Sequence, residues 1–124
     1  MLKTKPYNMT TFNRSRFKKL SEFKGANALS IYIPVEDGGD NRNKAMTKLK
    51  NHVQDAEKEL ETMGWKPREI EDFLKPINGL LNDATMFRNL NKSLAVFRSE
   101  SNFEYYSLPI EVEEFSLVSD VFHL

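Results

Sequence analysis

Basic side chains gather around the start of a long amphipathic segment, and they have the clearest potential for binding chemistry. The basic residues are Arg42, Lys44, Lys48 and Lys50, and the acidic residues that follow them are Asp55, Glu57, Glu59 and Glu61. A helix dipole favours the opposite order by roughly 0.3–1 kcal/mol per exposed group. Cations beside the free N–H groups of a helix start attract phosphate. We therefore expect a phosphate- or RNA-binding site here, with a solvated helix face as the alternative.

A second basic cluster surrounds a short helix that we expect to begin after the capping sequence 10–12 and to end at Gly25. The cluster comprises Arg14, Arg16, Lys18 and Lys19. Helical spacing relates Phe12, Phe17, Leu20 and Phe23. A solvated face is one interpretation, and a phosphate-facing helix to which Arg14 and Lys18 contribute is the other.

Catalytic constellations are poor in this chain. The absence of cysteine excludes disulfides, thiolate metal sites and cysteine nucleophiles. Of the two histidines, His52 is expected to be structural, and His123 ends the last expected strand. Oxygen ligands of the acidic loop 36–40 could bind a hard cation, but a solvated turn is the simpler interpretation. A hydrolase using Asp37, Asp40 and His123 is a third and weaker hypothesis, so we expect no enzyme activity, metal or cofactor.

Composition indicates one folded domain. The chain has 124 residues, 40% of them hydrophobic, and nine Phe, four Tyr and one Trp can fill a core. The formal net charge is zero, so the overall charge does not indicate nucleic acid or membrane. No signal peptide or membrane-spanning run is apparent, which favours a cytoplasmic protein.

Periodicity predicts the first strand and two helices. Residues 28–35 read as a strand with Leu29, Ile31 and Ile33 facing the core, Tyr32 on the other face, and a proline at its end. A helix over about 44–63 has a single apolar seam and stops at Gly64. The expected seam residues are Met46, Leu49, Val53, Ala56, Leu60 and Met63.

A second helix begins at Pro67, with Trp65 before it folding back onto the core. Its inner face is expected to carry Ile70, Phe73, Leu74, Ile77, Leu80 and Leu81. Pro76 predicts a kink or break near residues 73–75.

Three strands are predicted in the last third of the chain. Residues 93–98 and 103–108 are joined by a short polar turn and should form an antiparallel hairpin. A further strand over 113–119 follows an acidic stretch that would protect a sheet edge. This order indicates an α+β fold with helices packed on a mixed or antiparallel sheet of about four strands. Residues 1–9 read as a tail and residues 10–124 as a single domain.

The ordered set of segments resembles the N-terminal domain of the bacterial archaeo-eukaryotic release factor family, of the subtype usually numbered three. The segments are Leu29-Ser30-Ile31-Tyr32-Ile33-Pro34, Leu49-Lys50-Asn51 with Ala56-Glu57-Lys58-Glu59-Leu60, Ser93-Leu94-Ala95-Val96-Phe97, residues 103–109, and Asp120-Val121-Phe122-His123-Leu124. More distantly, the chain is similar to the N-terminal domains of eukaryotic release factor one and Pelota.

The resemblance implies an α/β sandwich with a four-stranded sheet, followed in the full protein by two further domains. It also implies a translation-related domain that faces the ribosome or RNA. Gly38-Gly39 is not the Gly-Gly-Gln release motif. Residues 41–44 lie at the position of the codon-reading tetrapeptide but do not match its sequence, so codon reading does not carry over.

Two functional hypotheses follow. The first is a non-catalytic domain of a release-factor-like protein that contacts ribosome or RNA through Arg42, Lys44, Lys48 and Lys50, with Arg14 and Lys18. The second is a protein–protein module in which an aromatic sheet face with Tyr105 and Tyr106, or the helical seam, docks downstream domains or a partner chain. A continuous positive patch favours the first hypothesis, and an exposed apolar patch favours the second.

Overall fold

The computed structural model describes residues 14–22, 27–35 and 41–124. The elements in chain order are α1 (Arg14–Ser21), β1 (Ala28–Pro34), α2 (Asn41–Thr62), α3 (Pro67–Leu80), α4 (Ala84–Arg88), β2 (Ser93–Arg98), β3 (Phe103–Leu108) and β4 (Phe115–Ser119). The α+β class predicted from the sequence is confirmed.

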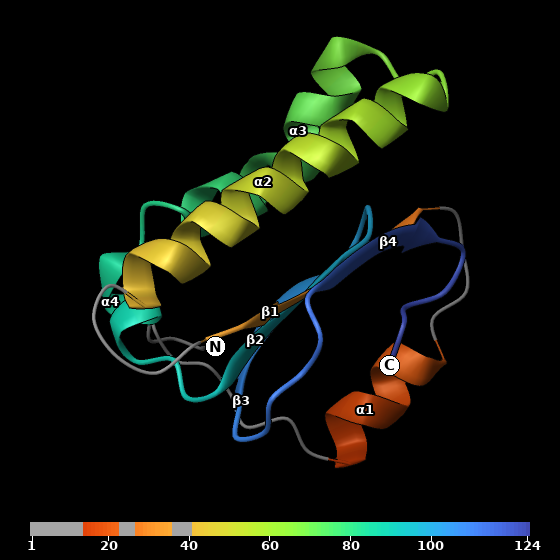
Figure 1. Ribbon diagram of the computed structural model, residues 1–124. Helices are drawn as coiled ribbons and strands as arrows, with labels where there is room; N and C mark the ends of the chain where they lie inside the picture. The colour runs from red at the N-terminus through yellow and green to blue at the C-terminus, as the bar shows by residue number, and fades with distance from the viewer. Residues whose placement is uncertain (1–13, 23–26, 36–40) are drawn as a thin grey trace.

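The four strands form one antiparallel sheet in the order β3-β2-β1-β4. The predicted hairpin is the β2–β3 pair, in which Ala95 lies opposite Tyr106. Helices α2, α3 and α4 lie on one face of the sheet, and the short α1 lies on the other (Figure 1). We call these the three-helix face and the α1 face.

The alternation of β1 divides its side chains between the two faces, as predicted. Leu29, Ile31 and Ile33 are fully buried under the three-helix face. Ala28 and Tyr32 pack on the α1 face. Tyr32 is only partly buried, so the α1 face of β1 is covered less completely than its other face, and the strand ends at its proline.

Helix α2 begins at Asn41, three residues before the predicted start, so its first turn includes Arg42. The seam prediction is confirmed for the buried residues Leu49, Val53, Ala56 and Leu60. It is wrong for Met63, whose side chain is 49% exposed, because the helix ends at Thr62 and the chain reverses at Gly64 with φ of 93°. Ala45 is buried at the other end of the seam.

Of the two predicted outcomes near residues 73–75, a kink or a break, the break does not occur, because α3 continues through Pro76. A proline leaves the carbonyl four residues earlier without its helical donor, and here that carbonyl belongs to Asp72. The guanidinium of Arg98 donates from Nη2 to Asp72 O at 3.3 Å and from Nε to Phe73 O at 2.6 Å. It also lies 5.1 Å from the centre of the Phe73 ring. Strand β2 thus supplies the donor that α3 lacks, and burial lowers the pKa of Arg98.

The short helix α4, which was not predicted from the sequence, lies between α3 and β2. Asp83 caps α4 by accepting a hydrogen bond from the Met86 N–H at 3.0 Å. The side chains of Met86 and Phe87 are buried in the core. Five residues are too few for helical periodicity to be recognised in a sequence.

Several expectations lie outside the described residues. They concern the tail 1–9, the capping residues 10–12, the helix end at Gly25, and the acidic loop with Asp37 and Asp40. Among the helices that are described, none is both long and apolar enough to cross a membrane.

Candidate functional site

The basic residues predicted on α2 do not share one surface. At 3.6 residues per turn, Lys48 and Lys50 are separated by roughly 200° around the helix axis. Lys50 lies on the flank facing α3, on the same side of the helix as Glu57 two turns further on. Lys48 lies one turn before His52, and His52 contacts β4. Lys48 therefore belongs to the opposite flank, together with Lys44. The side chain of Arg42 is not among those described.

The basic residues of α1 are separated from those of α2 by the sheet (Figure 1). Arg14 and Lys18 are exposed on α1. Arg16 instead hydrogen-bonds the buried Tyr106 hydroxyl, which also donates to Glu104. The pKa of Tyr106 is raised, mainly by burial and next by the hydrogen bond to Glu104 and the charge of that carboxylate. The five predicted binding residues with described side chains therefore lie on different surfaces, and the structure does not test Arg42.

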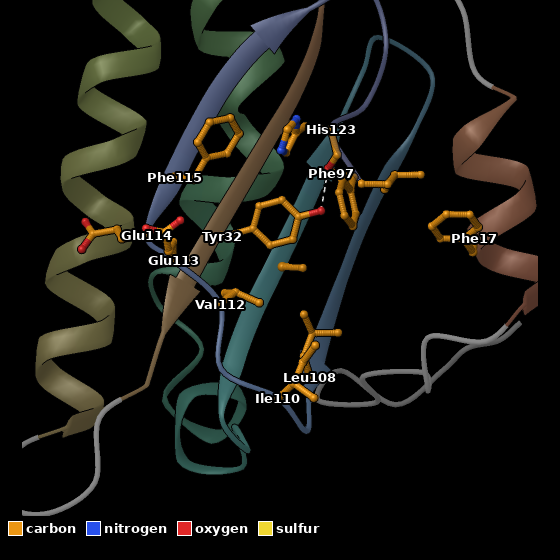
Figure 2. Close-up of a pocket in the computed structure, with 12 residues that line it drawn as sticks. Phe17, Tyr32, Phe97, Leu108, Ile110, Val112, Glu113, Glu114, Phe115 and His123 are labelled. Atoms are coloured by element: carbon orange, nitrogen blue, oxygen red, sulfur yellow. Dashed lines mark hydrogen bonds between the residues drawn. The ribbon is translucent and has the colours of Figure 1, made fainter.

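The α1 face carries a groove of about 630 Å³ that we call the apolar groove. Its floor consists of Tyr32, Ala95 and Phe97 from the two central strands. Tyr32 and Phe97 can be followed in Figure 2. Phe17 of α1 approaches from one side. The remaining wall residues come from the β3–β4 region and from the end of the chain: Leu108, Ile110, Val112, Glu113, Glu114, Phe115, His123 and Leu124.

A buried hydroxyl anchors the wall that follows β3. Ser93, with no exposed surface, donates from Oγ to the carbonyl of Ile110 at 2.7 Å and accepts from the Val112 N–H at 3.1 Å. These two bonds hold a connection that has no strand partner of its own. Two backbone polar groups of this wall are therefore satisfied by a buried residue of the sheet, which fixes the wall in place.

The end of the chain forms a second anchored wall. The His123 N–H donates to Ser30 Oγ at 2.9 Å, and the Tyr32 hydroxyl donates to the His123 carbonyl at 2.5 Å. Burial raises the pKa of Tyr32 to about 12, so its hydroxyl keeps its proton at neutral pH. Both Ser30 and Tyr32 belong to β1, which places this wall directly on the central sheet.

Large apolar side chains stay exposed around the groove. Ile110 is 61% exposed, Phe17 45% and Leu124 40%. Leu117 is 38% exposed and pairs with Ser30 in the register of β4, so it lies on this same face. An apolar patch that extends beyond a hollow is typical of a surface that binds another molecule.

The charged groups on the groove are acidic. Glu113 and Glu114 lie at one side (Figure 2), and no Lys or Arg occurs among the described residues that line it. Glu114 already contacts His52 through its carboxylate, whereas Glu113 is exposed and has no ion-pair partner within the described chain.

A serine, a histidine and a glutamate form a hydrogen-bonded chain between α2 and β4. His52 Nδ1 lies 2.9 Å from Ser116 Oγ, and Nε2 lies 2.7 Å from Glu114 Oε2. Hydrolase triads use the same residue types, but there the serine bonds Nε2 and the carboxylate bonds Nδ1, the reverse of the arrangement here. Neither His52 nor Ser116 lines the apolar groove. The arrangement links α2 to the edge strand β4, which agrees with the structural role predicted for His52. Elsewhere in the described chain, no cluster of three His, Asp or Glu residues is suited to a metal ion.

The prediction that Tyr105 and Tyr106 share one aromatic face of the sheet is wrong. Neighbouring residues of a strand point to opposite faces, so Tyr105 packs on the three-helix face and Tyr106 is buried on the α1 face. The groove that exists instead depends on Phe17, Ile110 and Leu124. In the sequence, the only indication of this groove was Ile110, an apolar residue that directly follows Pro109 between two strands.

Comparison with known proteins adds no identification. No protein-family model matches the chain, and a search of curated proteins finds no significant match. The resemblance to release factors stays a hypothesis, and the candidate site rests on the geometry of the described residues.

Proposed function

We propose that this domain is a non-catalytic docking module and that the apolar groove binds a segment of another polypeptide. The observation that carries the proposal is a preformed groove whose rim residues, Phe17, Ile110 and Leu124, remain exposed. Burying such side chains is favourable in proportion to the apolar area removed from water. The groove already has fixed walls, so binding does not have to order them.

A polypeptide fits these surroundings better than a small molecule does. The hollow of about 630 Å³ is within the range of small-ligand pockets. A ligand confined to the hollow would leave Leu117 exposed, because this residue lies along β4 and does not line the hollow. A polypeptide segment can fill the hollow and cover Leu117 together with the rim.

Site-specific photocrosslinking tests the docking proposal. A benzoylphenylalanine placed at Ile110 should give a discrete adduct in cells, because this position is on the groove rim. The matched control is Met63, which is exposed to a similar degree at the end of α2 and lies outside the groove. Equal adducts at the two positions, or none at Ile110, would reject the groove as a docking surface.

A second candidate function is contact with RNA or the ribosome in the cytoplasm, as part of a release-factor-like protein with downstream domains. It is favoured by the first turn of α2, which contains no acidic residue. Lys44 and Lys48 are four residues apart and share a flank of the helix, although both also make contacts within the protein. The resemblance of the sequence to release-factor N-terminal domains supports this candidate.

Ribosome sedimentation across a salt series tests the second candidate. Replacing Lys44 and Lys48 with Glu should weaken salt-sensitive co-sedimentation, because phosphate contacts release counterions. Lys50→Glu is the matched control on the opposite flank of the same helix. Identical salt curves for the double variant and the wild type would remove this function.

A further inference from the structure

We infer that the segment bound by the apolar groove is amphipathic, with a large apolar or aromatic side chain close to a Lys or Arg. This inference rests on the proposed docking function and adds the chemistry of the partner. The groove combines an aromatic floor with an acidic side, and each feature selects one part of such a segment.

The floor selects the apolar part. The rings of Tyr32 and Phe97 meet edge to face, with centroids 5.8 Å apart, and Phe115 lies 4.5 Å from the His123 ring. Phe97 is buried and packs edge to face on Phe122, with centroids 5.5 Å apart, so it supports the partly buried Tyr32 ring from within the core. An incoming aromatic or branched side chain would pack against fixed ring edges, a geometry that aromatic pairs favour.

The acidic side selects the basic part. Glu113 is exposed at the side of the groove, and no cation lies among the described lining residues. Glu114 is held by His52, which leaves Glu113 as the carboxylate able to pair with an occupant. An exposed pair of this kind contributes mainly to specificity and association rate. Its loss should change Kd roughly two- to fivefold.

A random library of 12-residue peptides displayed on phage and selected on the full-length protein tests this inference. The enriched peptides should contain a large apolar residue with a Lys or Arg nearby. Ile110→Ser and Phe17→Ser should each abolish enrichment, because both residues are exposed rim contacts whose replacement leaves the core intact. Met63→Ser should not.

Charge reversal isolates the acidic side. Selection on Glu113→Lys should shift the enriched peptides toward Asp and Glu, whereas Glu111→Lys should leave the preference for basic residues unchanged. Glu111 is the matched control, because it is also exposed but does not line the groove. One enriched peptide, measured by fluorescence polarisation, should bind Glu113→Gln two- to fivefold more weakly than wild type.

The outcomes separate the inference from the docking function. Apolar peptides that need Ile110 but show no charge preference would overturn the basic partner and leave the docking function intact. No enrichment sensitive to Ile110 would overturn both. A dimer in sedimentation velocity that Ile110→Ser dissociates would identify a second copy as the occupant. Enrichment seen only after deletion of residues 2–9 would identify the N-terminal segment instead, and either result would overturn the inference.

Discussion

The two faces of the sheet differ in how completely they are covered. Among the described residues, seventeen buried residues form the core under the three-helix face, whereas six form the core under α1. The cause lies in the helices: α2 and α3 have 22 and 14 residues, and α1 has 8. A helix of two turns cannot span a four-stranded sheet.

The comparison indicates that stability and binding are divided between the faces. The three-helix face buries its apolar side chains against its own helices, which is the ordinary way for a domain to build a core. The α1 face keeps Phe17, Ile110 and Leu124 exposed around a groove whose walls are held by Ser30 and Ser93. Variants on the two faces should therefore affect different properties.

The largest difference is expected for a leucine truncated on each face. Leu49→Ala removes a fully buried side chain under α2 and should lower the free energy of unfolding by about 2–5 kcal/mol. Leu117→Ala removes a side chain that is 38% exposed on the α1 face and should change it by no more than about 0.5 kcal/mol. Urea denaturation measures both, and similar costs would contradict the division between the faces.

Arg98→Ala should be the next most damaging change, because it removes the donors to the carbonyls of Asp72 and Phe73. Hydrogen bonds from a charged group contribute about 1.5–3 kcal/mol. The exposed Arg88 on α4 is a matched control, and Arg88→Ala should cost no more than about 0.5 kcal/mol.

A double-mutant cycle with Pro76→Ala sharpens this prediction. That change restores an N–H within α3 that can bond the Asp72 carbonyl, so Arg98→Ala should cost less in this background than in the wild type. Thermal and urea unfolding of the four proteins measure the coupling. Additive costs would mean that the arginine does not compensate for the proline.

Tyr32→Phe should have a smaller, pH-dependent effect, because it removes the hydroxyl that holds the His123 wall. The expected loss is about 1 kcal/mol at neutral pH. The pKa of Tyr32 rises from 10.0 to about 12 on folding, so the neutral hydroxyl favours the folded state. The stability advantage of wild type should persist below pH 10 and be lost as the pH rises through about 12, as followed by urea denaturation at several pH values. An advantage that is unchanged up to pH 12 would contradict it.

Ile110→Ser should have the smallest effect on stability, no more than about 0.5 kcal/mol, because the side chain is 61% exposed. The same change should remove peptide binding at the groove, whereas Met63→Ser on the other side of the molecule should spare it. A large loss of stability with Ile110→Ser would show that the rim belongs to the core, and the two faces would then not differ in role.

Local pattern was sufficient to predict most of the elements. Alternation divided Leu29 and Ile31 from Tyr32, and helical spacing identified the buried residues at the middle of α2. Gly64 and Pro67 marked where one helix ends and the next begins. These signals depend on neighbours within a few residues, so they can be recognised without knowing the fold.

The same local reasoning failed where a distant residue decides the outcome. Pro76 predicted a kink or a break, but α3 is unbroken, and the donor that compensates for the proline comes from Arg98 on another element. Tyr105 and Tyr106 were grouped by sequence, yet they lie on opposite faces of the sheet. Lys48 and Lys50 were grouped in the same way, and the helix turns them apart.

By itself, therefore, the sequence determined the α+β class, the four strands and the buried stripes of the main helices. Only the tertiary structure decided which face stays open and which residues surround the groove. Phe17, Ile110 and Leu124 line it from the first helix, a loop and the end of the chain. The physical reason is that periodicity reports which side of an element is buried, whereas a groove forms where elements far apart in the chain fail to cover one another.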